Sequence, residues 1–94
     1  MKLSVIMPVY NEKNTIREIV KKVMDVNVEK ELIIIDDNSS DGTKEILKNE
    51  YEGKDNIKLI YKEKNEGKTS AIKIGVKEAE GEIKYLLASI ESDP

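Results

Sequence analysis

The chain has 94 residues, of which 37% are charged, with a net charge of −3 and neither Cys nor His. A single domain is therefore expected, and disulfides, thiolate metal sites and imidazole bases or ligands are excluded. Charges of both signs are mixed along the chain, which argues against a nucleic-acid-binding face. No apolar run reaches the roughly 20 residues of a membrane span, and a strand pattern begins at Leu3. We therefore expect a cytoplasmic chain without a signal peptide or transmembrane segment.

The first predicted element is an apolar strand, Leu3–Val9. A helix follows, with Asn14 as its expected N-cap and an apolar stripe at helical spacing made of Ile16, Ile19, Val20, Val23 and Met24. Residues 31–35 form the second predicted strand. The next helix has Ser40 or Asp41 as its cap and carries Ile46, Leu47 and Tyr51.

The third predicted strand is Ile57–Tyr61, followed by a helix from about residue 68 to residue 79. That helix should turn Ile72, Val76 and Ala79 inward, although Gly75 costs it about 1 kcal/mol relative to Ala. Gly81 ends it before a fourth strand at residues 83–88. Strands that alternate with helices in this way predict right-handed βαβ units, a parallel sheet and the α/β class.

The second strand ends in two adjacent carboxylates, Asp36 and Asp37, which precede a turn-rich run. Ligands of open α/β sheets bind just beyond the carboxyl ends of the strands. Acidic side chains placed there need a polar or cationic partner, such as a ribose, a base edge or a metal-bound nucleotide. The alternative is that these acids only cap the next helix.

Two further segments follow strand ends. After the first strand, Tyr10 offers a ring on which a base can stack and Glu12 offers a carboxylate; the alternative is a plain connection to a helix. After the third strand, Gly67-Lys68-Thr69 ends like a phosphate-binding P-loop, but Lys62 stands where such a loop needs Gly. A lysine at a helix N-terminus near a diphosphate remains reasonable.

The order of these motifs is more specific than any one of them. Residues 3–12, 34–43 and 65–75, with Gly81-Glu82-Ile83, resemble the N-terminal, nucleotide-sugar-binding half of family 2 glycosyltransferases of the GT-A fold. The most similar branch is that of the dolichol- or polyprenol-phosphate mannosyl- and glucosyltransferases. The resemblance implies a three-layer α/β/α half of that fold over residues 1–94, with four parallel strands in the order 3-2-1-4.

The same resemblance implies a Rossmann-like site for a UDP- or GDP-type nucleotide or nucleotide sugar. Pro8, Tyr10 and Glu12 would line the base pocket. Asp37, next to Asp36, would bind the base or the ribose. Gly67 and Lys68 would lie near the diphosphate.

The end of the sequence departs from the family pattern. Leu87-Ala88-Ser89 stands where the family has an Asp-x-Asp motif that holds Mg²⁺ or Mn²⁺. We therefore expect no metal site and no catalytic residue here, weak and nearly metal-independent nucleotide binding, and no sugar transfer by these residues alone. Glu91 and Asp93 are the alternative metal ligands. A non-catalytic structural or partner-binding remnant of the fold is the alternative function.

The fourth predicted strand is apolar and only Lys84 opposes its pairing with another chain. An unprotected edge of this kind favours association, so the sequence also predicts a possible homodimer through the edge of strand four.

Overall fold

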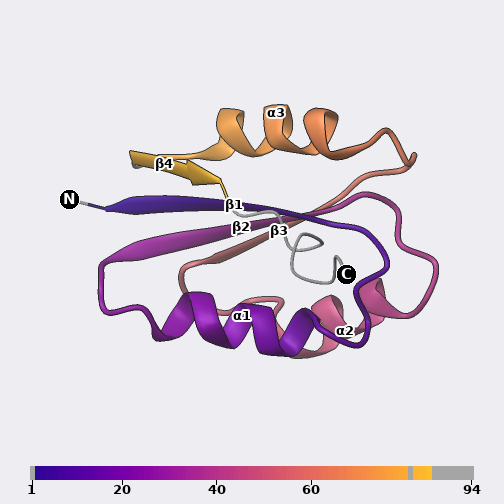
Figure 1. Ribbon diagram of the computed structural model, residues 1–94, viewed down its shortest axis with the longest axis horizontal. Helices are drawn as coiled ribbons and strands as arrows, with labels where there is room; N and C mark the ends of the chain where they lie inside the picture. The colour runs from indigo at the N-terminus through magenta and orange to yellow at the C-terminus, as the bar shows by residue number, and fades with distance from the viewer. Residues whose placement is uncertain (1, 81, 86–94) are drawn as a thin grey trace, which may run out of the picture.

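The computed structural model describes residues 2–80 and 82–85, and Figure 1 shows the arrangement of its elements. Strands and helices alternate along the chain. In order they are β1 (Leu3–Val9), α1 (Ile16–Asp25), β2 (Lys30–Asp36), α2 (Thr43–Glu50), β3 (Ile57–Tyr61), α3 (Lys68–Glu78) and β4 (Glu82–Tyr85).

The strands form one sheet in the order β3-β2-β1-β4, and every neighbouring pair is parallel. Leu3 lies opposite Lys30 on one side of β1 and opposite Glu82 on the other. Helix α3 covers one face of the sheet, while α1 and α2 cover the other (Figure 1). The predicted α/β class and parallel sheet are confirmed.

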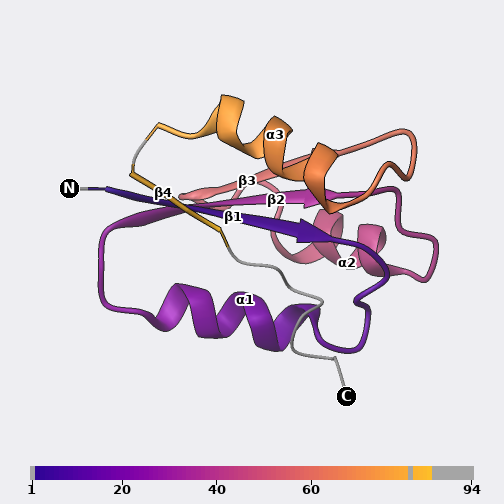
Figure 2. The same ribbon diagram turned by 45° about the horizontal axis from the view of Figure 1, so that its top comes forward.

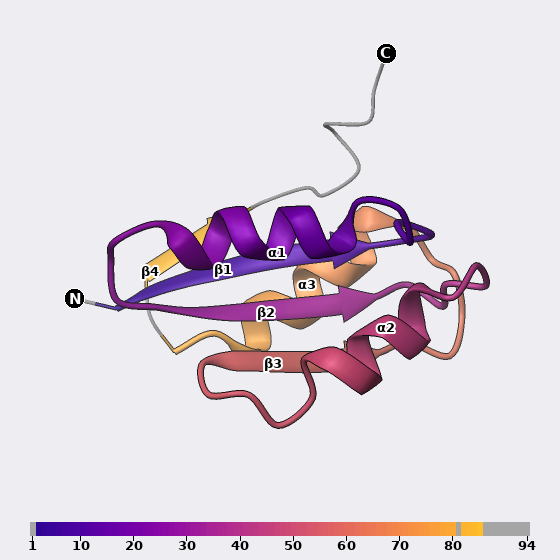
Figure 3. The same cartoon turned by 90° about the horizontal axis from the view of Figure 1, so that it is seen from below.

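The face toward α1 and α2 holds the larger core. Seen from below, α1 and α2 lie over this face of the sheet (Figure 3). Alternate side chains of β1 and β2 pack against the apolar stripe of α1 there. Its fully or nearly buried members include Met7, Leu32, Ile34, Ile16, Val20 and Leu47. The prediction for α1 is therefore confirmed, with Val23 and Met24 partly buried at the edge of the same cluster.

The opposite face is packed more closely than the sequence suggested. The buried residues of α3 are Ala71 and Gly75. Val76 and Ala79 are partly buried and pack against the cluster that contains Ile6 and Ile33, as predicted, whereas Ile74 packs there in place of the predicted Ile72. A Cβ atom on Gly75 would lie 2.5 Å from Cγ2 of Ile6, so Gly75 is what lets α3 approach the sheet.

Two predicted helix caps are also corrected. Helix α1 begins after Thr15 rather than Asn14, and the Thr15 hydroxyl donates to Glu12 Oε1 at 2.8 Å. Helix α2 begins after Gly42, whose φ of 109° is left-handed. Asp41 still binds a backbone N–H group at the start of α2, because its Oδ1 accepts the Thr43 N–H at 3.0 Å.

The predictions that concern the end of the sequence fall mostly outside the described residues. These are the second half of the fourth strand, the replacement of the Asp-x-Asp motif at residues 87–89, and Glu91 and Asp93. Dimer formation through strand four therefore stays a prediction. Within the described residues, no helix is long and apolar enough to cross a membrane.

Candidate functional site

Three loops meet at the carboxyl edge of the sheet. Strands β1, β2 and β3 end at Val9, Asp36 and Tyr61, and because the strands are parallel, the residues that follow them gather at the same edge. Figure 2 shows the arrowheads of β1 and β2 leading into this region, beside the N-terminal end of α3. This is the place where ligands of open α/β sheets bind.

A small pocket of about 30 Å³ opens here, lined by Pro8, Val9, Tyr10, Asp37 and Lys68. Four of these five were predicted as site residues from the sequence. They come from the end of β1, the end of β2 and the first turn of α3, so the fold brings distant segments together. The pocket does not enclose a whole nucleotide, and a bound nucleotide would extend over the open edge around it.

Tyr10 and Lys68 are the accessible members of this pocket. Tyr10 is 44% exposed, so its side chain is accessible to a ligand. Lys68 is exposed at the first position of α3, and within the described part of the chain it has no ion-pair partner. An exposed tyrosine and an exposed lysine with no ion pair among the described residues therefore both line the pocket.

Asp37 forms the polar wall of the pocket. Its Oδ1 accepts the N–H of Glu66 at 3.0 Å, and its Oδ2 accepts the N–H of Gly67 at 2.8 Å. Gly67 has a φ of 93°, a left-handed conformation that suits glycine. Burial raises the pKa of Asp37, but these two N–H groups and Lys62 outweigh it, and the pKa lies below its usual value. Asp37 is therefore held as a carboxylate.

Lys62 is a site residue that the sequence reasoning missed. Its side chain is 5% exposed, although lysine is rarely buried without a partner. Nζ lies 3.2 Å from Asp37 Oδ1 and 2.8 Å from Glu66 Oε1, and it donates to Ser70 Oγ at 2.7 Å. The Lys62–Glu66 spacing of four residues spans a loop rather than a helix, so no sequence pattern indicated this contact.

Polar side chains also join the loop after β1 to the loop after β2, and the sequence did not predict these contacts. The Asn11 N–H donates to Ser39 Oγ at 2.9 Å, and Asn11 Oδ1 accepts the N–H of Ser40 at 2.8 Å. The Lys13 N–H donates to Asp41 Oδ2 at 3.2 Å. Asn11 has a φ of 52°, which Asn tolerates better than most residues. These bonds fix the backbone next to Tyr10.

Three predicted site residues do not line the pocket: Gly67, whose N–H donates to Asp37, and the acids Glu12 and Asp36. Glu12 is 8% exposed, and its carboxylate accepts the Thr15 hydroxyl at the start of α1. Asp36 is fully buried, and its Oδ2 accepts the Ser39 N–H at 2.9 Å. Asp36 Oδ1 has no hydrogen-bond partner among the described residues. Both side chains stabilise the loops that surround the pocket rather than line it.

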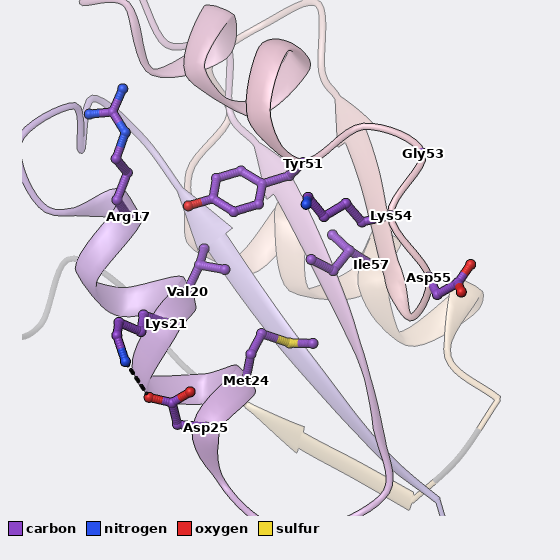
Figure 4. Close-up of a pocket in the computed structure, with 10 residues that line it drawn as sticks. All are labelled: Arg17, Val20, Lys21, Met24, Asp25, Tyr51, Gly53, Lys54, Asp55 and Ile57. Carbon is purple, nitrogen blue, oxygen red and sulfur yellow. Dashed lines mark hydrogen bonds and ion pairs between the residues drawn. The ribbon is translucent and has the colours of Figure 1, made fainter.

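A larger groove of about 570 Å³ lies elsewhere, between α1 and the connection from α2 to β3 (Figure 4). Its apolar wall includes Val20 and Met24. Two of its cations are already paired, since Arg17 contacts Glu50 at 2.6 Å and Lys21 contacts Asp25 at 2.7 Å. The smaller pocket lies at the carboxyl edge of the parallel strands, where ligands of open α/β sheets bind, so we place the candidate functional site there.

The pocket can therefore offer three different interactions to a ligand. Tyr10 supplies a stacking surface, Asp37 a hydrogen-bond acceptor, and Lys68 a positive charge at the N-terminal end of a helix, where anions are favoured. No cluster of three or more acidic side chains that could hold a metal ion occurs in the described part of the chain. The arrangement suits a ligand with an aromatic ring, hydroxyl or amide groups and a phosphate.

Comparison with known proteins agrees with this chemistry. The sequence model of the family described as "Glycosyl transferase family 2" matches residues 4–93. The chain is 35% identical over 97 residues to a dolichol-phosphate mannosyltransferase of Pyrococcus furiosus, a match that covers 100% of this chain and 27% of the relative. The chain thus spans about a quarter of the length of that curated relative.

Solved structures with the same fold bind nucleotide sugars. S. aureus TarS 1–349 in complex with UDP-GlcNAc has a TM-score of 0.82 and 32% identity, over 94% of this chain and 26% of that one. The mannosyltransferase PcManGT of Pyrobaculum calidifontis, in complex with GDP-Man and Mn²⁺, has a TM-score of 0.82 and 25% identity, over 92% of this chain and 27% of that one. The family match extends over nearly the whole sequence, and the chain belongs to glycosyl transferase family 2.

Proposed function

We propose that this chain binds the nucleotide part of a nucleotide sugar, with UDP and GDP as the candidate nucleotides. The observation that carries the proposal is the convergence of Tyr10, Asp37 and Lys68 on one pocket at the carboxyl edge. The proposal is supported by TarS complexes with UDP and UDP-GlcNAc and by the PcManGT complex with GDP-Man, whose folds resemble this chain.

Each residue has a role in this proposal. The base lies against the exposed Tyr10 ring and beside Pro8, and Asp37 accepts a hydrogen bond from the base or the ribose. Lys68 lies beside the diphosphate, where its ammonium group offsets the negative charge, and the Gly67 turn lets the backbone approach closely. Carboxylates that already accept two N–H groups have lone pairs left for a further donor, so Asp37 can serve both its loop and the ligand.

We further propose that these 94 residues do not transfer a sugar by themselves. The sequence has Leu87-Ala88-Ser89 where the family pattern has its two metal-binding carboxylates. A hydrophobic side chain and a hydroxyl do not replace that pair of negative charges as ligands of Mg²⁺ or Mn²⁺. Stabilising the charge that develops on a leaving diphosphate is usually the largest part of catalysis in such a reaction.

Calorimetric titration with UDP, GDP, UDP-GlcNAc and GDP-Man, each with and without Mn²⁺, tests this function. The expected result is weak binding of at least one nucleotide, with an affinity that changes little when Mn²⁺ is added. No heat and no saturation with any of the four would refute nucleotide binding. Tight binding that requires Mn²⁺ would refute the metal-independent site and direct attention to Glu91 and Asp93.

A further inference from the structure

We propose that Lys62 is a positioning residue of the nucleotide site, which fixes Asp37 and the loop before α3 and offsets their negative charge. The inference rests on the proposed function and deepens it. Lys62 does not line the pocket. Its effect on a ligand is therefore exerted through the residues that its ammonium group holds.

The hydrogen bonds of Lys62 explain why it acts indirectly. A lysine ammonium group has three N–H donors. In the structure, the three oxygen atoms near Nζ belong to Asp37, Glu66 and Ser70, at 3.2, 2.8 and 2.7 Å. Two ion pairs and one hydrogen bond therefore already engage this buried ammonium group. Lys68, exposed and unpaired among the described residues, is the cation that remains for the ligand.

The backbone of Lys62 adds to this arrangement. Its N–H donates to the Asp36 carbonyl at 2.9 Å, which extends the pairing of β2 and β3 by one residue beyond the strand ends. The side chain then crosses from this anchored backbone to Ser70 in the first turn of α3. Lys62 thus joins the end of β2, the end of β3 and the start of α3 at one point.

Charge gives Lys62 a second effect on the ligand. The carboxylates of Asp37 and Glu66 both contact Nζ, so they lie close together beside the place proposed for a diphosphate. The positive charge of Lys62 offsets part of this negative charge. Because the Lys62 ammonium group is buried, screening of its charge by solvent and salt is weak. Removal of Lys62 would leave two acidic groups near an anionic ligand, in addition to releasing the loop.

The chain offers a matched control at the other end of the same strand. Lys58 Nζ lies 3.7 Å from the buried Glu31 carboxylate and 3.5 Å from Glu80, and it is far from the carboxyl edge. Lys58→Met removes the same charge and also leaves a buried carboxylate with one partner fewer. The Lys58 side chain is 40% exposed, so Lys58→Met controls for the loss of one positive charge and of an ion pair to a buried carboxylate, away from the proposed nucleotide site.

The test compares binding of UDP and GDP, and of uridine and guanosine, to the wild-type chain, Lys62→Met, Lys62→Arg and Lys58→Met, at a temperature where each is folded. Lys62→Met should weaken nucleotide binding roughly tenfold or more, and weaken diphosphate binding more than nucleoside binding. Lys62→Arg should restore part of the loss, because it keeps the charge. Lys58→Met should leave the affinity within about twofold of the wild type.

An equal loss in Lys58→Met and Lys62→Met would overturn the inference, as would unchanged binding in Lys62→Met. A second readout does not need a nucleotide: an NMR titration of the Asp37 side-chain carboxyl carbon. The pKa of Asp37 should rise in Lys62→Met and stay unchanged in Lys58→Met. If the wild-type chain binds no nucleotide, the proposed function fails, and this titration alone decides whether Lys62 controls Asp37. An unchanged pKa of Asp37 in Lys62→Met would overturn the inference that Lys62 controls Asp37.

Discussion

The Asp37 carboxylate accepts the Gly67 N–H at 2.8 Å and thereby joins the end of β2 to the residue before α3. The two residues are 30 positions apart, and Asp37 is only 4% exposed. A single carboxylate thus holds the loop that contains Glu66 and Gly67, and faces the buried ammonium group of Lys62.

Asp37→Ala should therefore lower the free energy of unfolding by about 3 kcal/mol, because it leaves Lys62 with one buried partner fewer and two N–H groups unpaired. Asp37→Asn should cost less, since its amide oxygen still accepts one N–H. Urea unfolding followed by circular dichroism measures both. Asp55→Asn, at an exposed acid, is the control, and equal stability of Asp37→Ala and Asp55→Asn would contradict the role given to Asp37.

Gly75→Ala should destabilise the chain even though Ala is the better helix former. A Cβ atom there would lie 2.5 Å from Ile6 Cγ2 and 3.0 Å from Ile35 Cδ1, so α3 would have to move away from the sheet. Overpacking of this kind costs about 1–3 kcal/mol, which exceeds the gain of about 1 kcal/mol in helix propensity. Thermal unfolding measures the change, with the exposed Lys73→Ala in the same helix as the control. An increase in Tm for Gly75→Ala would show that the contact is not restrictive.

Glu31 should make stability depend on pH. It is 3% exposed, accepts the Ser4 hydroxyl at 2.6 Å and the Glu80 N–H at 2.8 Å, and lies near Lys58. Burial raises the pKa of Glu31, but these contacts outweigh it and the pKa lies below the usual 4.5. The unfolded chain therefore binds more protons in this range, so the contribution of Glu31 is present above about pH 4.5 and is lost as the pH falls through the folded pKa.

The Glu31→Gln variant keeps a side-chain oxygen that can accept the hydrogen bond from the Ser4 hydroxyl, but it has no negative charge. The difference in the free energy of unfolding between the wild type and this variant should be largest near pH 6 and should shrink toward pH 3. Urea unfolding at a series of pH values measures it. A difference that stays constant over this range would mean that Glu31 is not held as a carboxylate in the folded chain.

Tyr10→Ala and Lys68→Ala should weaken nucleotide binding with little change in stability, because both side chains are exposed. Loss of a stacked ring costs about 1–3 kcal/mol of binding free energy in comparable sites, which is about 5- to 150-fold in affinity. Lys68→Ala should affect UDP more than uridine, since its charge acts on phosphate. Calorimetry measures affinity, and the exposed Lys64→Ala serves as a control for the loss of one positive charge. Unchanged nucleotide affinity in Tyr10→Ala would contradict the stacking role proposed for Tyr10.

Hydrophobic periodicity predicted the type and order of the elements, and the rule that ligands bind beyond strand ends predicted the edge where the candidate site lies. The apolar stripe of α1 and the apolar strands β1 to β3 lie where the pattern placed them, because burial of one face decides their structure. Pro8 lies near the end of β1, Tyr10 and Asp37 directly follow β1 and β2, and Lys68 begins the helix after β3. Parallel strands bring such residues to one edge. This part of the site depends only on topology.

The remaining features depend on contacts between distant segments, which periodicity does not encode. Gly75 looked unfavourable for a helix, yet the close approach to Ile6 requires it. Lys62 entered the sequence analysis only as the residue that breaks the P-loop pattern, yet its ammonium group is buried and contacts Asp37 and Glu66. Glu12 carried a ligand role by resemblance, and its carboxylate instead accepts the Thr15 hydroxyl. In each case, the role of the residue depends on a contact with a neighbour that only the folded chain provides.

The location of the nucleotide site is tested most directly by two-dimensional ¹⁵N NMR of the chain during titration with UDP and with GDP. Saturable shifts are predicted for the amides of Tyr10, Asp37, Gly67 and Lys68 with at least one of the two nucleotides. The amide resonances of residues that line the larger groove, such as Val20 and Met24, should not shift. Saturable shifts confined to that groove, or none at the carboxyl edge with either nucleotide, would contradict the account.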